Sequence, residues 1–290
     1  MALNLKTFTT RTLTAAVFVA VLLSCIFFNY VSFSVLFLFV SVWGLYEFYQ
    51  LAEKLGAKPY KAIGLITGAL VFCQAFIANS IFAEHYPTSK LIAICLAFLF
   101  IIFIVALFDT KANTVLNITY TITGIIYAVI PFTLLLRIAC IDSSFIASNT
   151  LHTIAPYNFH YVLGIILLIW ISDVGAYLVG SFIGKHKLYA RISPGKTWEG
   201  SIGATILTIA SSYIISVWYP ELALKHWVVI SILVSVFGTL GDLVESMLKR
   251  QAGVKDSGKI MPGHGGILDR FDSLLFVSPF VYAYLELFVK

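Results

Sequence analysis

Long apolar runs recur along nearly the whole chain, each close to the roughly 20 residues that cross a bilayer as a helix. They lie at about residues 12–28, 31–49, 62–83, 90–108, 117–137, 159–183, 197–219, 226–248 and 273–289. Backbone N–H and C=O groups in hydrocarbon must be hydrogen-bonded within the protein, which favours helices. The pattern therefore predicts an all-α fold, a polytopic membrane bundle of about nine transmembrane helices.

Composition supports this fold class. Hydrophobic residues make up 60% of the chain and charged residues only 11%, whereas soluble domains carry about 25% charged residues. The first run follows Lys6 and Arg11 and has the outline of a signal peptide, but the chain continues through Phe27, Phe28 and Tyr30 without a small-residue cleavage site. We therefore expect this first span to be retained.

The distribution of basic residues predicts an orientation. With the N-terminus in the cytoplasm, every Lys and Arg except Lys90, Arg137, Lys225 and Lys290 falls on the cytoplasmic side. Positive charge gathers in cytoplasmic loops of membrane proteins, which predicts a cytoplasmic N-terminus. The net charge of +5 reflects this bias and two basic clusters on the cytoplasmic side, where some of the charges are expected to meet anionic lipid headgroups. We expect no nucleic-acid partner.

The two halves of the chain differ in their polar residues. Up to about residue 150 the spans are nearly free of charge and are expected to act as a scaffold, whereas residues 160–290 carry ionisable residues and Gly-rich loops. No internal repeat separates them, so residues 1–290 are predicted to form a single membrane domain. Glu47, near the end of the second span, is expected to snorkel or to cap a helix rather than to catalyse.

Asp173 lies well inside the predicted span 159–183, beside Ser172 and Gly175. A charge near the bilayer centre costs about 3 kcal/mol on insertion scales, so such residues usually face a cavity and serve a function. The small neighbours allow close helix packing or a water-lined cleft. The alternative role for Asp173 is a pairing that locks two helices together.

A second candidate is the segment Ser193-Pro194-Gly195-Lys196-Thr197. The phosphate-loop pattern of nucleoside triphosphatases requires Gly where Ala190 stands, which excludes that fold. A turn, a lysine and a helix N-terminus still make a good phosphate site. The alternative is simply a capped helix start with Thr197 at its head.

The segment with the most candidate catalytic and binding residues runs from Asp242 to Asp272. Asp242, Glu245 and Ser246 stand three and four residues apart and so share one face of a helix, and Asp269 and Asp272 share a face at the start of the last span. Two helix ends are expected to bring Asp242, Asp269 and Asp272 together. Crowded carboxylates favour a hard cation with oxygen ligands, so these three are the predicted metal ligands for Mg²⁺, with room for a second cation.

Basic residues and glycines complete this segment. Glycines let backbone N–H groups approach a phosphate closely, and Lys and Arg supply charge. His264 is a single histidine, which does not make a zinc site, and it is expected to assist the leaving phosphate or to hold the Gly turn. A basic loop that only anchors anionic lipid would not explain acidic pairs at helical spacing. The predicted catalytic residues are Asp173, Asp242, Ser246, His264, Asp269 and Asp272, and the predicted substrate-binding residues are Lys196, Lys249, Arg250, Lys255, Asp256, Gly265, Gly266 and Arg270.

The segment also resembles a known family. Ser246-x-x-Lys249-Arg250, Lys255-Asp256 and His264-Gly265-Gly266-x-x-Asp269-Arg270-x-Asp272 closely resemble the signature of phosphatidate cytidylyltransferases (CDP-diacylglycerol synthases), and the spacing matches throughout. Met261 stands where Leu, Ile or Phe is usual and keeps the apolar character. The Asp173 segment and Ser-Pro-Gly-Lys-Thr-Trp-Glu-Gly look like further family elements. Before Asp173 the resemblance is one of hydropathy alone.

The resemblance implies the reaction CTP + phosphatidate → CDP-diacylglycerol + pyrophosphate, Mg²⁺ as cofactor, a homodimer, and a bacterial inner-membrane enzyme with its active site facing the cytoplasm. The choice of CTP rests on the resemblance, because no spacing selects the base. Two alternatives stay open: a related nucleotidyltransferase acting on a prenyl-type phosphate lipid, and an ion-coupled transporter using Asp173 and Asp242. The pattern of CDP-alcohol phosphotransferases, Asp-Gly-x-x-Ala-Arg followed by Gly-x-x-x-Asp-x-x-x-Asp, does not occur.

Overall fold

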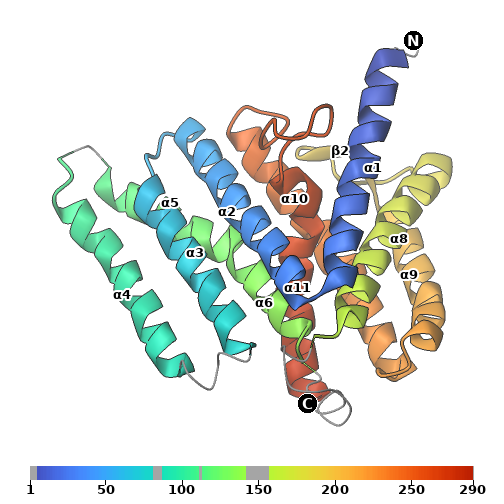
Figure 1. Cartoon of the computed structure of the whole chain (residues 1–290). Coiled ribbons are helices and arrows are strands. Elements are labelled where there is room, and N and C mark those ends of the chain that lie inside the picture. The colour runs from blue at the N-terminus through green and yellow to red at the C-terminus, as the bar shows by residue number, and fades with distance from the viewer. Residues whose placement is uncertain (1–4, 81–86, 111–112, 142–156, 290) are drawn as a thin grey trace. The chain divides into compact units, whose positions relative to one another are not determined.

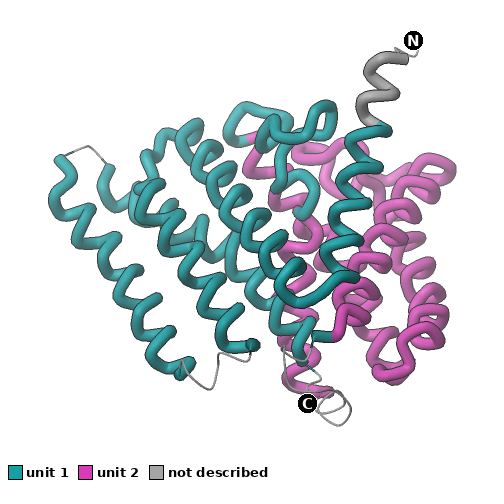
Figure 2. Tube along the Cα trace, viewed as in Figure 1, with its two compact units in different colours: residues 1–157, 251–271 teal, residues 158–250, 272–290 magenta. Residues whose placement is uncertain are grey.

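A computed structural model describes residues 5–80, 87–110, 113–141 and 157–289, with side chains from residue 12 onward. Within these ranges the regular secondary structure is helical apart from one two-stranded sheet (Figure 1). It divides into two compact units: Met1–Tyr157 with Gln251–Phe271, and Asn158–Arg250 with Asp272–Lys290 (Figure 2). The single membrane domain stays a prediction. Most of the signature segment, Gln251–Phe271, belongs to the same unit as the first half of the chain, and its two ends, Ser246–Arg250 and Asp272, belong to the second unit.

The described part of the first unit contains α1 (Leu5–Phe28), α2 (Tyr30–Lys54), α3 (Lys61–Ala78), α4 (Thr88–Leu107), α5 (Thr114–Ala128) and α6 (Ile130–Ile138). The predicted span 117–137 corresponds to α5 and α6 together, interrupted at Val129. Pro131 lies in the first turn of α6 and has no backbone N–H to donate to the preceding turn, which explains the interruption.

The second unit contains α8 (Phe159–Ile183), β1 (Lys187–Tyr189), β2 (Ser193–Thr197), α9 (Trp198–Trp218) and α10 (Leu224–Gln251), and α11 (Leu268–Phe288) from Asp272 onward. The sequence predicted a turn at Ser193–Thr197, but this segment is a strand that pairs antiparallel with β1, Lys187 opposite Thr197. The Thr197 Oγ1 atom accepts the Gly200 N–H at 3.2 Å, so the predicted capped helix start is confirmed.

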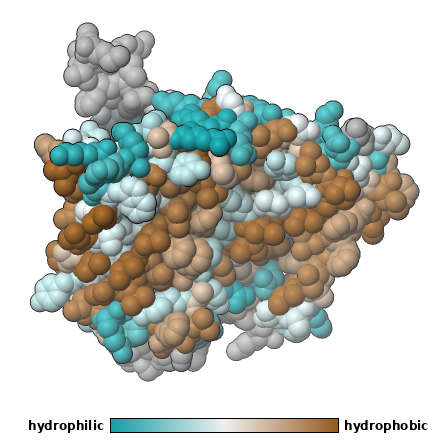
Figure 3. All heavy atoms as spheres, turned by 180° about the vertical axis from the view of Figure 1, so that it is seen from behind, coloured by the Kyte–Doolittle hydropathy of each residue, from teal (hydrophilic) through white to brown (hydrophobic). Residues whose placement is uncertain are grey.

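Within the described residues, eight helical segments are long and apolar enough to cross a membrane when α5 and α6 (Thr114–Ile138) are counted as one, and the apolar part of α1, Thr12–Phe28, is shorter. Many of their apolar side chains are exposed; Phe100 and Leu107 on α4 are 68% and 79% exposed. Hydrophobic residues cover much of the face seen in Figure 3, as expected where lipid is the solvent. The polytopic helical membrane fold is confirmed. The orientation stays a prediction. Lys111, which was counted on the cytoplasmic side, and Lys290, which was counted on the opposite side, lie outside the described residues.

Small residues allow close helix packing in the second unit. A Cβ atom on Gly175 of α8 would lie 3.3 Å from the Ala204 Cα atom and 2.9 Å from the Leu207 Cδ1 atom of α9. Ser172, beside Asp173, is buried. The close packing that the sequence predicted at Gly175 is confirmed, and it holds the helix that carries Asp173 against α9.

Candidate active site

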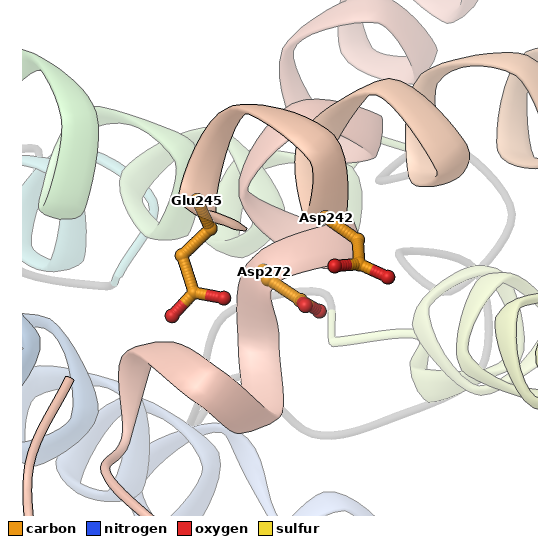
Figure 4. Close-up of side chains that lie close together, drawn as sticks. All are labelled: Asp242, Glu245 and Asp272. Carbon is orange, nitrogen blue, oxygen red and sulfur yellow. The ribbon is translucent and has the colours of Figure 1, made fainter. Parts of the chain in front are cut away.

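Three carboxylates meet in the second unit. Asp242 and Glu245 extend from α10, and Asp272 extends from α11 toward them (Figure 4). One carboxylate oxygen from each residue lies within 4.8 Å of those from the other two. Glu245 is fully buried, whereas Asp242 and Asp272 are half-buried. The structure thus brings together two of the three predicted metal ligands and adds Glu245, whose helical spacing from Asp242 was the signal available in the sequence.

A glycine face on α10 allows α11 to approach. A Cβ atom on Gly241 would lie 2.6 Å from the backbone oxygen of Asp272 and 3.0 Å from the Cβ atom of Phe276. One turn earlier, the carbonyl of Gly238 accepts a hydrogen bond from the Ser273 hydroxyl at 3.2 Å. Helices whose contact residues lack side chains can bring their backbones close together. The distance between Asp242 and Asp272 therefore depends on Gly241.

Replacing Gly241 with alanine should destabilise the protein by about 1–3 kcal/mol, the usual cost of overpacking a tight contact. The added methyl group meets backbone, which cannot turn away as a side chain can. Thermal unfolding of the purified protein in detergent measures the change. The matched control is Gly195→Ala, because a Cβ atom there meets no atom within 4 Å. Equal unfolding midpoints for both variants would contradict the proposed role of Gly241.

Lys196 and Ser246 both contact Asp242. The Lys196 ammonium, on β2, lies 2.6 Å from the Asp242 Oδ2 atom and donates to the Thr239 carbonyl at 3.3 Å. The Ser246 hydroxyl donates to the Asp242 Oδ1 atom at 3.1 Å. Both carboxylate oxygens of Asp242 are therefore oriented by neighbours. The sequence placed Lys196, Ser246 and Asp242 in one site, and the structure brings all three together.

Two further charges act on this cluster. Lys249 is buried and its ammonium lies 2.8 Å from the Glu245 Oε2 atom, one helical turn away. Asp173 on α8 and Lys249 both interact electrostatically with Asp272. Asp173 is exposed on α8, and its catalytic role stays a prediction. Lys249 was expected to bind phosphate; that function stays a prediction, and the contact seen is with Glu245.

The charge of this group suits one divalent cation. With every group ionised, the carboxylates of the cluster and of Asp173 exceed the ammonium groups of Lys196 and Lys249 by two negative charges. All the candidate ligand atoms are carboxylate oxygens, the donors that hard cations such as Mg²⁺ prefer. The residues therefore fit the predicted metal by charge, donor type and proximity.

A second group of predicted residues lies in the first unit. The Asp269 Oδ2 atom accepts hydrogen bonds from the Ser257 N–H at 2.9 Å, the Ser257 hydroxyl at 3.0 Å and the Gly266 N–H at 2.7 Å. Asp269 therefore holds together two parts of the loop that joins α10 to α11 (residues 252–267, the signature loop). The sequence did not predict this role. Its function as a metal ligand stays a prediction.

The glycine turn is shaped by this network. Gly265 has a φ angle of +83°, and a side chain there would collide with the Asp269 carboxylate, so glycine is required. The Met261 N–H donates to the Gly265 carbonyl at 3.0 Å, and the His264 N–H donates to the Met261 carbonyl at 2.9 Å. His264 thus lies inside a tight turn. Its buried Nδ1 atom has no hydrogen-bond partner within the described residues.

The remaining charged residues predicted to bind substrate are exposed: Arg250, Lys255, Asp256 and Arg270. Lys255 and Asp256 line an open pocket of about 940 Å³ in the first unit, together with Lys259. Exposed cations in loops can reach a soluble polyphosphate. Substrate binding by these four residues stays a prediction.

Glu47 makes long-range contacts that its place in the sequence does not indicate. It is 1% exposed, and its carboxylate accepts the backbone N–H groups of Ile267 and Leu268, each at 3.0 Å, and the Ser257 hydroxyl at 2.9 Å. The expectation that Glu47 caps a helix is confirmed, but the helix is α11, more than 200 residues away along the chain. No local signal predicts such a partner.

Comparison with known proteins supports the resemblance seen in the sequence. The chain is 52% identical over 122 residues to the phosphatidate cytidylyltransferase of Staphylococcus haemolyticus (strain JCSC1435), a match that covers 41% of this chain and 46% of that protein. It is 49% identical over 134 residues to the phosphatidate cytidylyltransferase of Bacillus subtilis (strain 168), covering 46% and 49%. The chain thus spans about half the length of the curated relatives it matches. A family model described as the cytidylyltransferase family matches residues 9–288, and because that match spans nearly the whole chain, the protein belongs to the cytidylyltransferase family.

Proposed function

We propose that this protein is a phosphatidate cytidylyltransferase, which converts CTP and phosphatidate to CDP-diacylglycerol and pyrophosphate. The observation that carries the proposal is the group of Asp242, Glu245 and Asp272 beside Lys196, on helices long and apolar enough to cross a membrane. A site for a lipid phosphate and a nucleotide needs acidic metal ligands and a cation at the bilayer. The names of the relatives give the substrates.

In the proposed reaction an oxygen of the phosphatidate phosphate attacks the α-phosphorus of CTP. A new P–O bond forms as the bond from the α-phosphorus to the bridging oxygen breaks, and pyrophosphate leaves. Asp242, Glu245 and Asp272 would hold Mg²⁺, which when bound neutralises charge on phosphate oxygens. Lys196 binds a phosphate oxygen, and Ser246 keeps the Asp242 carboxylate in its orientation. Placement of the two substrates accounts for most of the catalysis.

The other assignments extend this proposal. Lys249, Arg250, Lys255 and Arg270 contact the triphosphate, His264 assists the departing pyrophosphate, and the protein acts as a homodimer. Exposed cations around a site raise the local concentration of anionic substrates. The proposed location is the bacterial inner membrane with the site facing the cytoplasm, which the positive-inside pattern and the bacterial relatives support.

The test is a transfer assay with labelled CTP, phosphatidate and Mg²⁺. We expect CDP-diacylglycerol and pyrophosphate in equal amounts, and removal of the metal with EDTA should lower the rate by on the order of a hundredfold or more, because phosphate charge is then unopposed. Excess Mg²⁺ should restore the rate. Parallel reactions with dCTP, UTP and a prenyl phosphate define the substrates. Transfer only to the prenyl phosphate, or ion uptake by vesicles without transfer, would replace the proposal with one of the alternatives.

A further inference from the structure

We infer that Glu47 is a positioning residue for the signature loop, fixing Ser257, Gly266 and the first turn of α11 from a helix that otherwise belongs to the scaffold. As a statement about catalysis this inference rests on the proposed function. As a statement about the loop it stands on the contacts within the first unit alone, and the two can be tested separately.

The start of α11 takes hydrogen-bond acceptors from Glu47, which lies on α2. Ile267, the residue before the helix, has no side chain that accepts a hydrogen bond, and the first N–H groups of a helix have no partner within it. The Glu47 Oε1 atom accepts the Ile267 N–H and the Oε2 atom accepts the Leu268 N–H, each at 3.0 Å. A carboxylate at this position also interacts favourably with the positive end of the helix dipole.

The same carboxylate reaches the other end of the loop. The Ser257 hydroxyl lies 2.9 Å from the Glu47 Oε2 atom and 3.0 Å from the Asp269 Oδ2 atom, so Ser257 bridges the two acidic residues. Gly258 and Gly266 lie against Glu47 so closely that a Cβ atom on either would collide with its carboxylate. Glu47 therefore contacts the loop at Ser257 and Gly258, again at Gly266, and then the first turn of α11.

Burial makes these contacts necessary. A carboxylate removed from water is strongly unfavourable unless hydrogen bonds replace its hydration. Two backbone N–H groups and one hydroxyl supply them, and all three come from the signature loop and its junction with α11. Helix α2 is otherwise held to this region by packing: Gly44 lies against Leu268, and the Phe37 ring contacts that of Phe271. The hydrogen bonds to the buried charge thus define which backbone groups of the loop face Glu47, whereas the apolar packing brings α2 and α11 into close contact.

The position matters because the loop and α11 carry predicted substrate and metal residues. Gly265 and Gly266 lie within the loop, and Asp272 follows Leu268 by one turn of the same helix. A misplacement of about 1 Å at a distance from the reacting atoms can lower a rate by about a hundredfold. Glu47 itself touches neither substrate in this scheme; it acts through the loop.

Hydrogen exchange of the substrate-free protein in detergent micelles tests the structural part. Glu47→Gln keeps the size of the side chain but exchanges a charged acceptor for an amide, one end of which donates. We expect the amides of Ile267 and Leu268, which donate to Glu47, to exchange about tenfold faster or more, because hydrogen bonds to charged groups are among the stronger ones. Glu53→Gln is the matched control, since Glu53 lies on the same helix and forms an exposed ion pair with Lys61. No increase in Glu47→Gln, or an equal increase in Glu53→Gln, overturns the inference.

Kinetics test the positioning role. Per folded molecule, Glu47→Gln should lower kcat/KM for CTP by about tenfold or more, and Glu47→Asp, which keeps the charge but is shorter, should give an intermediate value. A residue that only stabilised the fold would reduce the folded fraction and leave this constant unchanged, and that result would reject positioning. If Glu47→Gln does not fold, Glu47→Asp carries both measurements. If the wild-type protein makes no CDP-diacylglycerol, the proposed function fails while the exchange result still decides the role of Glu47 in the loop.

Discussion

Replacing Asp242 with asparagine should lower the rate of CDP-diacylglycerol formation by on the order of a hundred- to a thousandfold, the usual effect of removing one electrostatic contact from a transition state. Asp242 shares the carboxylate cluster with Glu245 and Asp272, and it is the partner of both Lys196 and Ser246. The substitution removes one negative charge from the cluster and releases Lys196. The measurement is the initial rate of transfer at saturating CTP and phosphatidate.

Metal binding provides a second readout that does not depend on turnover. Mn²⁺ can replace Mg²⁺ as a spectroscopic probe, and Asp242→Asn should weaken its binding, as judged by electron paramagnetic resonance of the free ion. Lys58→Ala is the control for both measurements: the Lys58 side chain is exposed, and the backbone N–H of Lys58, which donates to the Asn117 Oδ1 atom at 2.6 Å, is kept. Wild-type activity in Asp242→Asn, or an equal loss in Lys58→Ala, would contradict the assignment of the site.

Asp269→Asn should also nearly abolish CDP-diacylglycerol formation in folded protein, by about a hundredfold or more. One Asp269 oxygen accepts hydrogen bonds from Ser257 and Gly266, including two backbone N–H groups. The asparagine side chain can accept these hydrogen bonds only if its single oxygen points at the two N–H groups. The negative charge that strengthens the contacts is lost in either case. The loop is then expected to lose its fixed shape. The measurement is again the initial transfer rate, per folded molecule.

The Mn²⁺ titration separates two roles for Asp269. Because Asp242, Glu245 and Asp272 form a cluster without it, we expect Asp269→Asn to bind the metal nearly as the wild type does while losing activity. Loss of both would show that Asp269 is a metal ligand, the role that its spacing from Asp272 suggests. Retained activity would remove it from the site altogether.

The helices were largely predictable from the sequence. Spans at 159–183, 197–219 and 226–248 correspond to α8, α9 and α10 to within a few residues, because the thickness of the bilayer sets the length of an apolar run. The interruption of α5 and α6 at Val129 and the short hairpin of β1 and β2 were not predicted. An apolar run continues through a helix break without a change in hydropathy, and a hairpin of a few residues has no period to detect.

Part of the site was predictable for a similar reason. Asp242, Glu245 and Ser246 share a face because one helix carries them, and helical spacing is visible in the sequence. The signature from Ser246 to Asp272 was recognised from the same local spacing. The signature did not show that Lys249 would pair with Glu245. A lysine at that position of the helix can contact a substrate as well as a neighbouring carboxylate.

By itself, the sequence determined that this protein is built of membrane helices with acidic residues at helical spacing near residues 242 to 272, because bilayer thickness and helical period act over short stretches of chain. Only the tertiary structure decided that Lys196 meets Asp242, that Asp269 ties Ser257 to Gly266, and that Glu47 caps α11. Gly266 lies three residues from Asp269, but Ser257 lies twelve residues from Asp269 and Leu268 lies 221 residues from Glu47. What pairs them is the burial of charge, which leaves each carboxylate dependent on whichever donor the packing brings within reach.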